Sequence, residues 1–268
     1  MTHQIVAHFQ TANSAAQASA AQILHAQMGG LLLKPDTLDG QGEQVNSAQR
    51  LEDSERVLED HYCTMMTSPR GGIIDVAAEH RKAMTGFIQS RRHVLTELKT
   101  IIVSVSPDSG SQQVAVETLA ALCAASVAPA CIRILATDVP ADASVDVVYA
   151  PLAEYAREAQ IAVTPGASLP GSTSFAKAQQ FRMPIAAVLN RAVDFETELT
   201  AARINGAPEK IVHALAHKVI AQRDLLGTAD TFKRIADTLG LPCISQNEWC
   251  AECAPPANRK RAKTAIPE

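Results

Sequence analysis

The chain has 268 residues, of which 47% are hydrophobic, 19% charged and only 4% aromatic, and its formal net charge at pH 7 is −4. This composition is typical of a globular protein and excludes a disordered or fibrous one. The slight acidity gives no overall attraction toward DNA or anionic lipid, and the scarcity of aromatic rings disfavours binding of single-stranded nucleic acid by base stacking. Any nucleic-acid contact would have to be local.

The sequence shows no signal for export or membrane insertion. Residues 1–9 lack the basic start and apolar run of a secretory signal, and the most apolar window, 119–136, is interrupted by Ser126, Pro129 and Arg133. We therefore expect no membrane contact and a cytoplasmic location. In that compartment the cysteines at 63, 123, 131, 243, 250 and 253 are expected to stay reduced.

Short aliphatic runs alternate with helix-like segments in the first half of the chain. Strands are predicted at 4–9, 31–33, 71–76, 100–105 and 132–136, and helices at 15–28, 46–66, 78–98 and 112–125, with a loop at 108–111. Aliphatic strands that alternate with helices predict an α/β fold with a doubly wound, mainly parallel sheet and helices on both faces.

The second half of the chain is less regular. Runs at 145–149, 161–163 and 185–189 are candidates for further strands, and the Pro-, Gly- and Ser-rich stretch 165–174 reads as a long loop. Apolar residues at helical spacing predict helices at 209–226 and 230–239. We expect a single α/β domain over 1–249, with a helical C-terminal part at 209–241 and an unstructured basic tail over 250–268.

Four segments carry a resemblance to known proteins. They are QIVAHFQTANSAAQASAAQILHAQM at 4–28, GGIIDVAAEH at 71–80, KTIIVSVSPDSGSQQVAVETLAAL at 99–122 followed by IRILATDV at 132–139, and KVIAQRDLLGTADTFKRIADTLGL at 218–241. In order and local character the chain resembles the ParA/MinD group of P-loop ATPases and, within it, the StbB-type plasmid stability proteins. The resemblance implies a P-loop NTPase-like fold, a homodimer, a plasmid-encoded protein partner, and a role in plasmid stability, partition or control of conjugative transfer.

The phosphate-binding loop of that group is degenerate in this chain. Its matching segment, 10–19, contains neither the glycines that let backbone N–H groups cradle phosphates nor the lysine that neutralises them. The resemblance places the lysine at Gln17, the Mg²⁺-binding hydroxyl at Ala18 or Ser19, and the acid that orients Mg²⁺ through water at Asp75. The degenerate nucleotide-site positions are Gln10, Thr11, Asn13, Ser14, Gln17, Ser19 and Asp75.

Without that lysine and those glycines, tight binding of a nucleoside triphosphate has no visible source of energy. We therefore expect no catalytic residue, no bound nucleotide and no Mg²⁺. Thr137-Asp138 stands where the group often has an adenine-reading asparagine, which weakens adenine recognition as well. Asp36 and Asp39 follow the second strand, where the group places an acid near the attacking water, but their turn-rich loop accounts for them.

Two alternative functions stay open. The first is an active enzyme or nucleotide-binding switch of another doubly wound family, with its site at the carboxyl ends of the strands. The residues expected to gather there are His8, Asp75, Ser106, Asp108 and Asp138. The second is a DNA-binding adaptor that acts through the basic tail and the 209–241 helices, with salt-sensitive phosphate contacts from Arg259, Lys260, Arg261 and Lys263.

No metal site is predicted. His213 and His217 lie one helical turn apart, but they lack the glutamate of the zinc-protease motif and a third ligand, so a solvated helix face is the preferred interpretation. Cys250 and Cys253 have the spacing of half a zinc site, with only Cys243 to add a third thiolate. A reduced thiol pair is preferred there.

Overall fold

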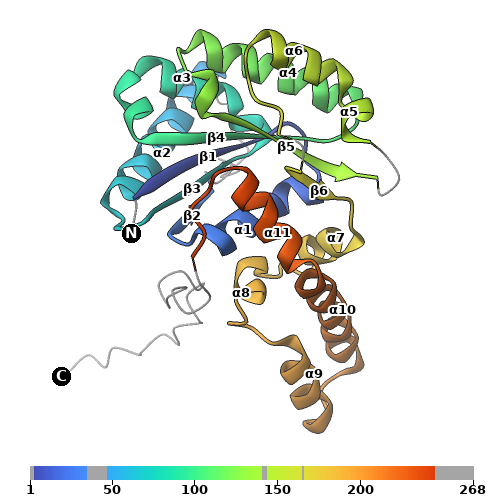
Figure 1. Cartoon of the computed structure of the whole chain (residues 1–268). Helices are drawn as coiled ribbons and strands as arrows, with labels where there is room; N and C mark the ends of the chain where they lie inside the picture. Colours follow the sequence, from blue (N-terminus) through green and yellow to red (C-terminus); the bar gives the residue numbers. More distant parts are fainter. Residues whose placement is uncertain (1–2, 35–46, 141–143, 165, 245–268) are drawn as a thin grey trace, which may run out of the picture.

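Six parallel strands form the central sheet of the computed structural model, in the order β2-β3-β1-β4-β5-β6 (Figure 1). The structure describes residues 3–34, 47–140, 144–164 and 166–244, without the side chains of 47–54. The strands are β1 (Gln4–Gln10), β2 (Leu31–Leu33), β3 (Gly71–Val76), β4 (Leu98–Val105), β5 (Ile132–Val139) and β6 (Ser168–Pro170). The predicted α/β fold with a parallel, doubly wound sheet is confirmed.

Helices cover both faces of this sheet (Figure 1). One face carries α2 (Ser47–Thr67), α3 (Arg81–Ser90), α4 (Ser109–Ala124), α5 (Val145–Val148) and α6 (Ala150–Glu158), with 3₁₀ turns at Ala78–His80, Arg92–Thr96 and Pro129–Cys131. The other face carries α1 (Ala15–Met28), α7 (Thr173–Gln180), α8 (Ile185–Leu189), α9 (Phe195–Ile204), α10 (Glu209–Gly227) and α11 (Ala229–Thr238). Helices α10 and α11 form the predicted helical C-terminal part. Helices α9 and α10 extend away from the sheet (Figure 1).

Strand β1 shows how the sequence builds two hydrophobic cores. Ile5, Ala7 and Phe9 are fully buried in the core under α2–α6, whereas Val6 is buried in the core that contains α1. Successive strand residues point to opposite faces, so the next residues on the α1 side are His8 and Gln10. Both are polar, and both are buried.

Several predictions for residues 140–190 are wrong. The run at 145–149 forms α5, the run at 185–189 forms α8, and 161–163 forms no strand. A short apolar run does not distinguish a strand from a buried helix by its period, and here the contacts with the rest of the fold decide. Conversely, β6 lies inside the stretch predicted as a loop, where it pairs with β5 at Ala136↔Ser168 and Val139↔Pro170.

Two helix boundaries also differ from the prediction. The segment 78–98 is divided between a 3₁₀ turn, α3 and a second 3₁₀ turn. Helix α4 begins at Ser109, inside the predicted loop, because the carboxylate of Asp108 caps it by accepting a hydrogen bond from the backbone N–H of Ser111 at 2.8 Å. The predicted tail, 250–268, lies outside the described residues.

Two glycines at the start of β3 allow this strand to lie between β1 and β2. A Cβ atom on Gly71 would stand 2.2 Å from the carbonyl oxygen of Gln4, and one on Gly72 would stand 2.1 Å from that of Leu31. Gly71 also has a φ of +73°, a backbone conformation that other residues adopt only with strain. The sheet therefore requires glycine at 71 and 72, where the pairing begins that places Asp75 opposite His8.

We expect Gly71→Ala to lower the free energy of unfolding by about 1–3 kcal/mol, from backbone strain alone. Urea denaturation followed by circular dichroism measures the change. The matched control is Gly227→Ala at the end of α10, where an added Cβ meets no atom within 4 Å. A loss in the control as large as in Gly71→Ala would contradict the steric account.

Candidate functional site

Polar side chains replace aliphatic ones on the α1 face of the sheet where four strands end. His8, Asp75, Ser104 and Thr137 each lie two positions after an aliphatic residue of the α1-side core, and all four are buried. In the sheet, His8 is paired with Asp75, and Gln10 is paired with Ser104. After β1 the chain forms β3 and β2 on one side of this strand, and it then forms β4, β5 and β6 on the other side. The strand order therefore reverses between β1 and β4, where the polar group lies. Ligands of open α/β sheets usually bind at such a point.

Asp75 is the hub of this group. Its Oδ1 accepts hydrogen bonds from His8 Nδ1 at 2.8 Å and Gln10 Nε2 at 2.8 Å, and its Oδ2 lies 3.0 Å from Lys34 Nζ. Burial raises the pKa of this carboxyl, but the hydrogen bond and charge interaction with His8, the charge of Lys34 and the hydrogen bond from Gln10 together hold its pKa below the ordinary value of 3.8. Asp75 is therefore a buried carboxylate that stays charged at neutral pH.

The histidine connects Asp75 to a serine on the neighbouring strand. Ser104 Oγ lies 2.5 Å from His8 Nε2, and the carboxylate orients the imidazole through Nδ1. This is the order of groups in a nucleophilic Asp-His-Ser triad. However, Asp75 is only 2% exposed, and His8 and Ser104 are completely buried. In this conformation no substrate can reach the hydroxyl. The three buried side chains instead provide hydrogen-bond partners for one another.

Gln17, in the first turn of α1, fills the loop that follows β1. Its Oε1 accepts the backbone N–H groups of Thr11 at 2.8 Å and Ala12 at 3.0 Å. Its Nε2 donates to Thr11 Oγ1 at 3.2 Å and to Ser106 Oγ at 2.9 Å. The side chain is completely buried and all four of its amide hydrogen bonds are made. The backbone N–H groups of Thr11 and Ala12 thus have an internal partner.

The N-terminus of α1 faces an acidic side chain. Ser14 caps the helix by accepting the backbone N–H of Gln17 at 3.1 Å, and its hydroxyl donates to Asp138 Oδ2 at 2.8 Å. Ser106 Oγ donates to the same carboxylate oxygen at 3.4 Å. A carboxylate is favourable at the positive end of a helix dipole. Asp138 therefore supplies negative charge beside the loop from within the chain.

The structure brings together most, but not all, of the predicted site residues. Gln10, Thr11, Ser14, Gln17 and Asp75 join the network, Asn13 is exposed, and Ser19 lies further along α1, outside it. Of the residues considered for an enzyme site, His8, Ser106 and Asp138 also join, whereas Asp108 serves to cap α4.

The network also contains Lys34, Ser104 and Ser111, which are not among the site residues predicted from the sequence. Ser111 Oγ lies 2.7 Å from Thr11 Oγ1 and accepts the backbone N–H of Ser106 at 2.9 Å. Ser104 lies on the same face of its strand as Ile102, and Lys34 directly follows the end of β2. Both positions therefore could have been predicted from the sequence. Ser14 and Gln17 have the spacing of a capping box, in which the glutamine reaches back toward loop N–H groups.

No cluster of three His, Cys, Asp or Glu side chains that could hold a metal ion occurs within the described part of the chain. His213 is exposed as predicted, but the ring of His217 is half-buried and stacks on Phe181, with 5.6 Å between ring centroids. Cys243 donates to Asp237 at 3.1 Å, and burial together with Asp237 raises the pKa of its thiol to about 11, which disfavours the thiolate. Asp36, Asp39, Cys250, Cys253 and the four basic tail residues lie outside the described residues.

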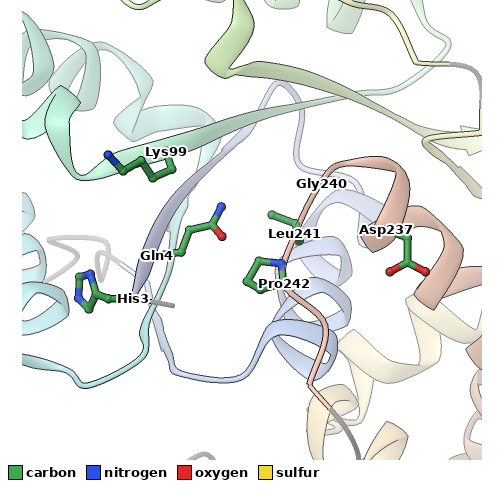
Figure 2. Close-up of a pocket in the computed structure, with 7 residues that line it drawn as sticks. All are labelled: His3, Gln4, Lys99, Asp237, Gly240, Leu241 and Pro242. Carbon is green, nitrogen blue, oxygen red and sulfur yellow. The ribbon is translucent and has the colours of Figure 1, made fainter. Parts of the chain in front are cut away.

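A cavity of about 580 Å³ lies at the opposite edge of the sheet, where β1 and β4 begin (Figure 2). Its polar side chains already have partners: His3 Nε2 lies 3.2 Å from the Met65 carbonyl, Gln4 donates to Thr100 Oγ1 at 3.1 Å, and Lys99 donates to the Thr96 carbonyl. The remaining wall comes from Asp237 and the segment 240–242. Because this cavity lies where the parallel strands β1 and β4 begin, it is at the opposite end of the strands from the polar network.

We expect Asp75→Asn to destabilise the protein at pH 7 by about 1–3 kcal/mol, because the buried groups that bind the carboxylate lose the negative charge with which they interact. A carboxyl whose pKa is lower in the folded than in the unfolded state stabilises the fold above its unfolded pKa, and this contribution is lost as pH falls through the folded pKa. The difference in unfolding free energy between the wild type and Asp75→Asn should therefore shrink as pH falls below 3.8.

Urea denaturation at a series of pH values from neutral to acidic measures this difference. Asp60→Asn is the control, because Asp60 is exposed on α2 and its side chain makes no ion pair with a described residue. A difference for Asp75→Asn that stays constant into the acidic range would refute the assignment of Asp75 as the charged hub.

Among the described residues, no helix combines the length and apolar character that a membrane crossing requires. Comparison of the chain with protein families, with curated proteins and with solved structures gave no match.

Proposed function

We propose that this chain is a catalytically inactive relative of the ParA- and StbB-type ATPases, whose α/β fold serves as an interaction platform in plasmid stability, partition or control of conjugative transfer. In this proposal it acts as a homodimer with a plasmid-encoded protein partner. The resemblance of the sequence motivates the proposal. The observation that carries its inactive character is the occupation of the loop after β1 by the side chain of Gln17.

A working phosphate loop offers backbone N–H groups and a lysine to the phosphates. In this chain the N–H groups of Thr11 and Ala12 are held by Gln17 Oε1. A phosphate would have to displace this amide and break its hydrogen bonds, and the loop offers no cation in return. The carboxylate of Asp138 at the N-terminus of α1 would also repel it. These interactions support a loop closed to nucleotide.

The position of the acid leads to the same conclusion. Asp75 lies next to the β1 loop, as the resemblance implies for the acid that orients Mg²⁺, but its Oδ2 is paired with Lys34 at 3.0 Å and its Oδ1 with His8 and Gln10. A divalent ion would have to compete with an ammonium group already in place. Lys34 therefore supplies the positive charge that a metal would supply in an active relative.

An active enzyme is less well supported. The relay of Asp75, His8 and Ser104 has the right order for a nucleophile and its base, but the hydroxyl is completely buried. The DNA-binding adaptor depends in part on Arg259, Lys260, Arg261 and Lys263, which lie outside the described residues. Neither alternative accounts for a loop in which Gln17 accepts the backbone N–H groups of Thr11 and Ala12.

The surface of α9 and α10 supports a role in protein binding. Ile204, the last residue of α9, is 79% exposed, and Ile211, in the first turn of α10, is 49% exposed, on the two helices that extend from the body of the protein (Figure 1). Ile220 is 46% exposed but lies two and a half turns further along α10, on the opposite side of the helix from Ile211. A partner that covers large exposed aliphatic side chains removes their apolar surface from water, which favours binding. We assign the binding of the partner to this helix pair.

We expect no Mg²⁺-dependent rise in the thermal unfolding temperature with ATP, ADP or GTP, and no release of phosphate from ATP or GTP. A nucleotide present at 100 times its Kd would add about 2.7 kcal/mol of stability, which thermal unfolding readily detects. Each nucleotide is tested with Mg²⁺ and with EDTA, so that binding that needs the metal is separated from simple anion binding. A saturable, Mg²⁺-dependent shift with turnover would overturn the inactive assignment.

The role in plasmid maintenance is tested in cells that carry the gene. We expect deletion of the gene to change plasmid retention or transfer frequency. Complementation should be impaired by Ile204→Glu with Ile211→Glu, because the added charges prevent an apolar partner from covering these helices. Val147→Glu is the control, since Val147 is 74% exposed on α5, on the other face of the sheet. Equal complementation by all variants would exclude α9 and α10 as the partner surface.

A further inference from the structure

A second cavity, of about 380 Å³, lies beside α1 and outside the polar network of the β1 loop. Its walls come from α1, from Lys34 after β2, and from the end of α7 with the segment that leads into α8. The volume is within the range of small-molecule pockets. We propose that this cavity binds a small anion through a phosphate group.

The walls of the cavity are cationic. Lys34 and Arg182 both line the cavity, and no described residue that lines it carries a carboxylate. The side chain of Lys34 is 44% exposed, so it is open to a ligand although it also pairs with Asp75. Arg182 is exposed, and within the described part of the chain it makes no ion pair. The lining of the cavity therefore carries two cationic side chains, of which Arg182 has no anionic partner among the described residues.

The cavity also offers hydrogen-bond donors to a ligand. Ser19 is only 3% exposed and lines the cavity, yet its hydroxyl bonds no described residue. The side chain of Gln22 is held by its Oε1, which accepts the backbone N–H of Ile185 at 3.0 Å, so its Nε2 group is the donor left for a ligand. An oxyanion in the cavity would accept hydrogen bonds from both groups.

A phosphate group fits this set of donors better than a carboxylate does. It carries up to two negative charges and several acceptor oxygens, and guanidinium and ammonium groups are its usual partners in proteins. Lys34 and Arg182 match its charge, while Ser19 and Gln22 match its remaining acceptors. The wall formed by Met183 and Ile185 is apolar, so a short organic group attached to the phosphate is also accommodated.

Arg191 provides a matched control within the same chain. Arg182 and Arg191 are both exposed, both have a positive φ, of 48° and 56°, and each follows the end of a helix. Their backbone N–H groups bond the carbonyls of Gln179 and Val188, at 3.1 Å and 3.0 Å. Only Arg182 lines the cavity. Replacing either arginine by glutamine therefore changes a similar local structure and an equal charge.

The experiment is calorimetric titration of the full chain with inorganic phosphate and with glycerol 3-phosphate, without Mg²⁺ and at constant ionic strength. We expect saturable binding of at least one of the two, weakened about tenfold or more in Arg182→Gln and unchanged in Arg191→Gln. Thermal unfolding without ligand verifies that both variants fold as the wild type does. Ser19→Ala, which removes only a hydroxyl, should weaken binding by a smaller factor.

Absence of saturable binding, or equal binding by Arg182→Gln and the wild type, would overturn the proposal. Acetate at the same concentration should not compete, and competition by acetate as strong as by phosphate would refute the preference for a phosphate group. The titration contains no metal and no nucleoside triphosphate, and its decisive variant lies outside the β1 loop. Its outcome is therefore independent of whether the chain is an inactive ATPase relative.

Discussion

The buried carboxylate of Asp75 organises the carboxyl edge of the sheet. A lone carboxylate at 2% exposure would take up a proton rather than stay charged. Here His8, Gln10 and Lys34 approach its two oxygens from β1 and from the end of β2. The charge is thereby retained, and the ends of three neighbouring strands are held together by it. Gly71 and Gly72 at the start of β3 also contribute, because they let this strand pair closely with both β1 and β2.

The polar groups around Asp75 are arranged to satisfy one another. Thr11 donates to the carbonyl of Ser104 at 2.7 Å and accepts from Gln17, and Ser106 and Ser111 continue the chain of hydrogen bonds. A buried polar network stabilises a fold only when each of its members has a partner. In the β1 loop, Gln17 accepts the backbone N–H groups of Thr11 and Ala12, so a ligand could bind these two groups only by displacing its side chain.

Lys34 connects the two sites because it pairs with Asp75 and also lines the cavity beside α1. The positive charge near α1 therefore lies at the end of β2 and at Arg182, and not in the β1 loop. A cation in the loop would have faced the backbone N–H groups of Thr11 and Ala12, which the neutral amide of Gln17 now accepts. The chemistry available to an anion is thus placed beside the helix rather than at its N-terminus.

The sequence by itself determined the α/β fold, the five aliphatic strands, and the gathering of His8, Asp75, Ser106 and Asp138 where the parallel strands end, because strand parity and the direction of parallel strands are local properties. The resemblance to the ParA/MinD group, and not strand parity, places Gln10, Thr11, Ser14 and Gln17 beside them. It did not determine α5, α8 or β6, whose short runs take their conformation from tertiary packing. Nor did it reveal that Gln17 closes the loop or that Lys34 pairs with Asp75. His8 and Ser104 are 96 residues apart in the chain, and only the paired strands bring such groups into contact.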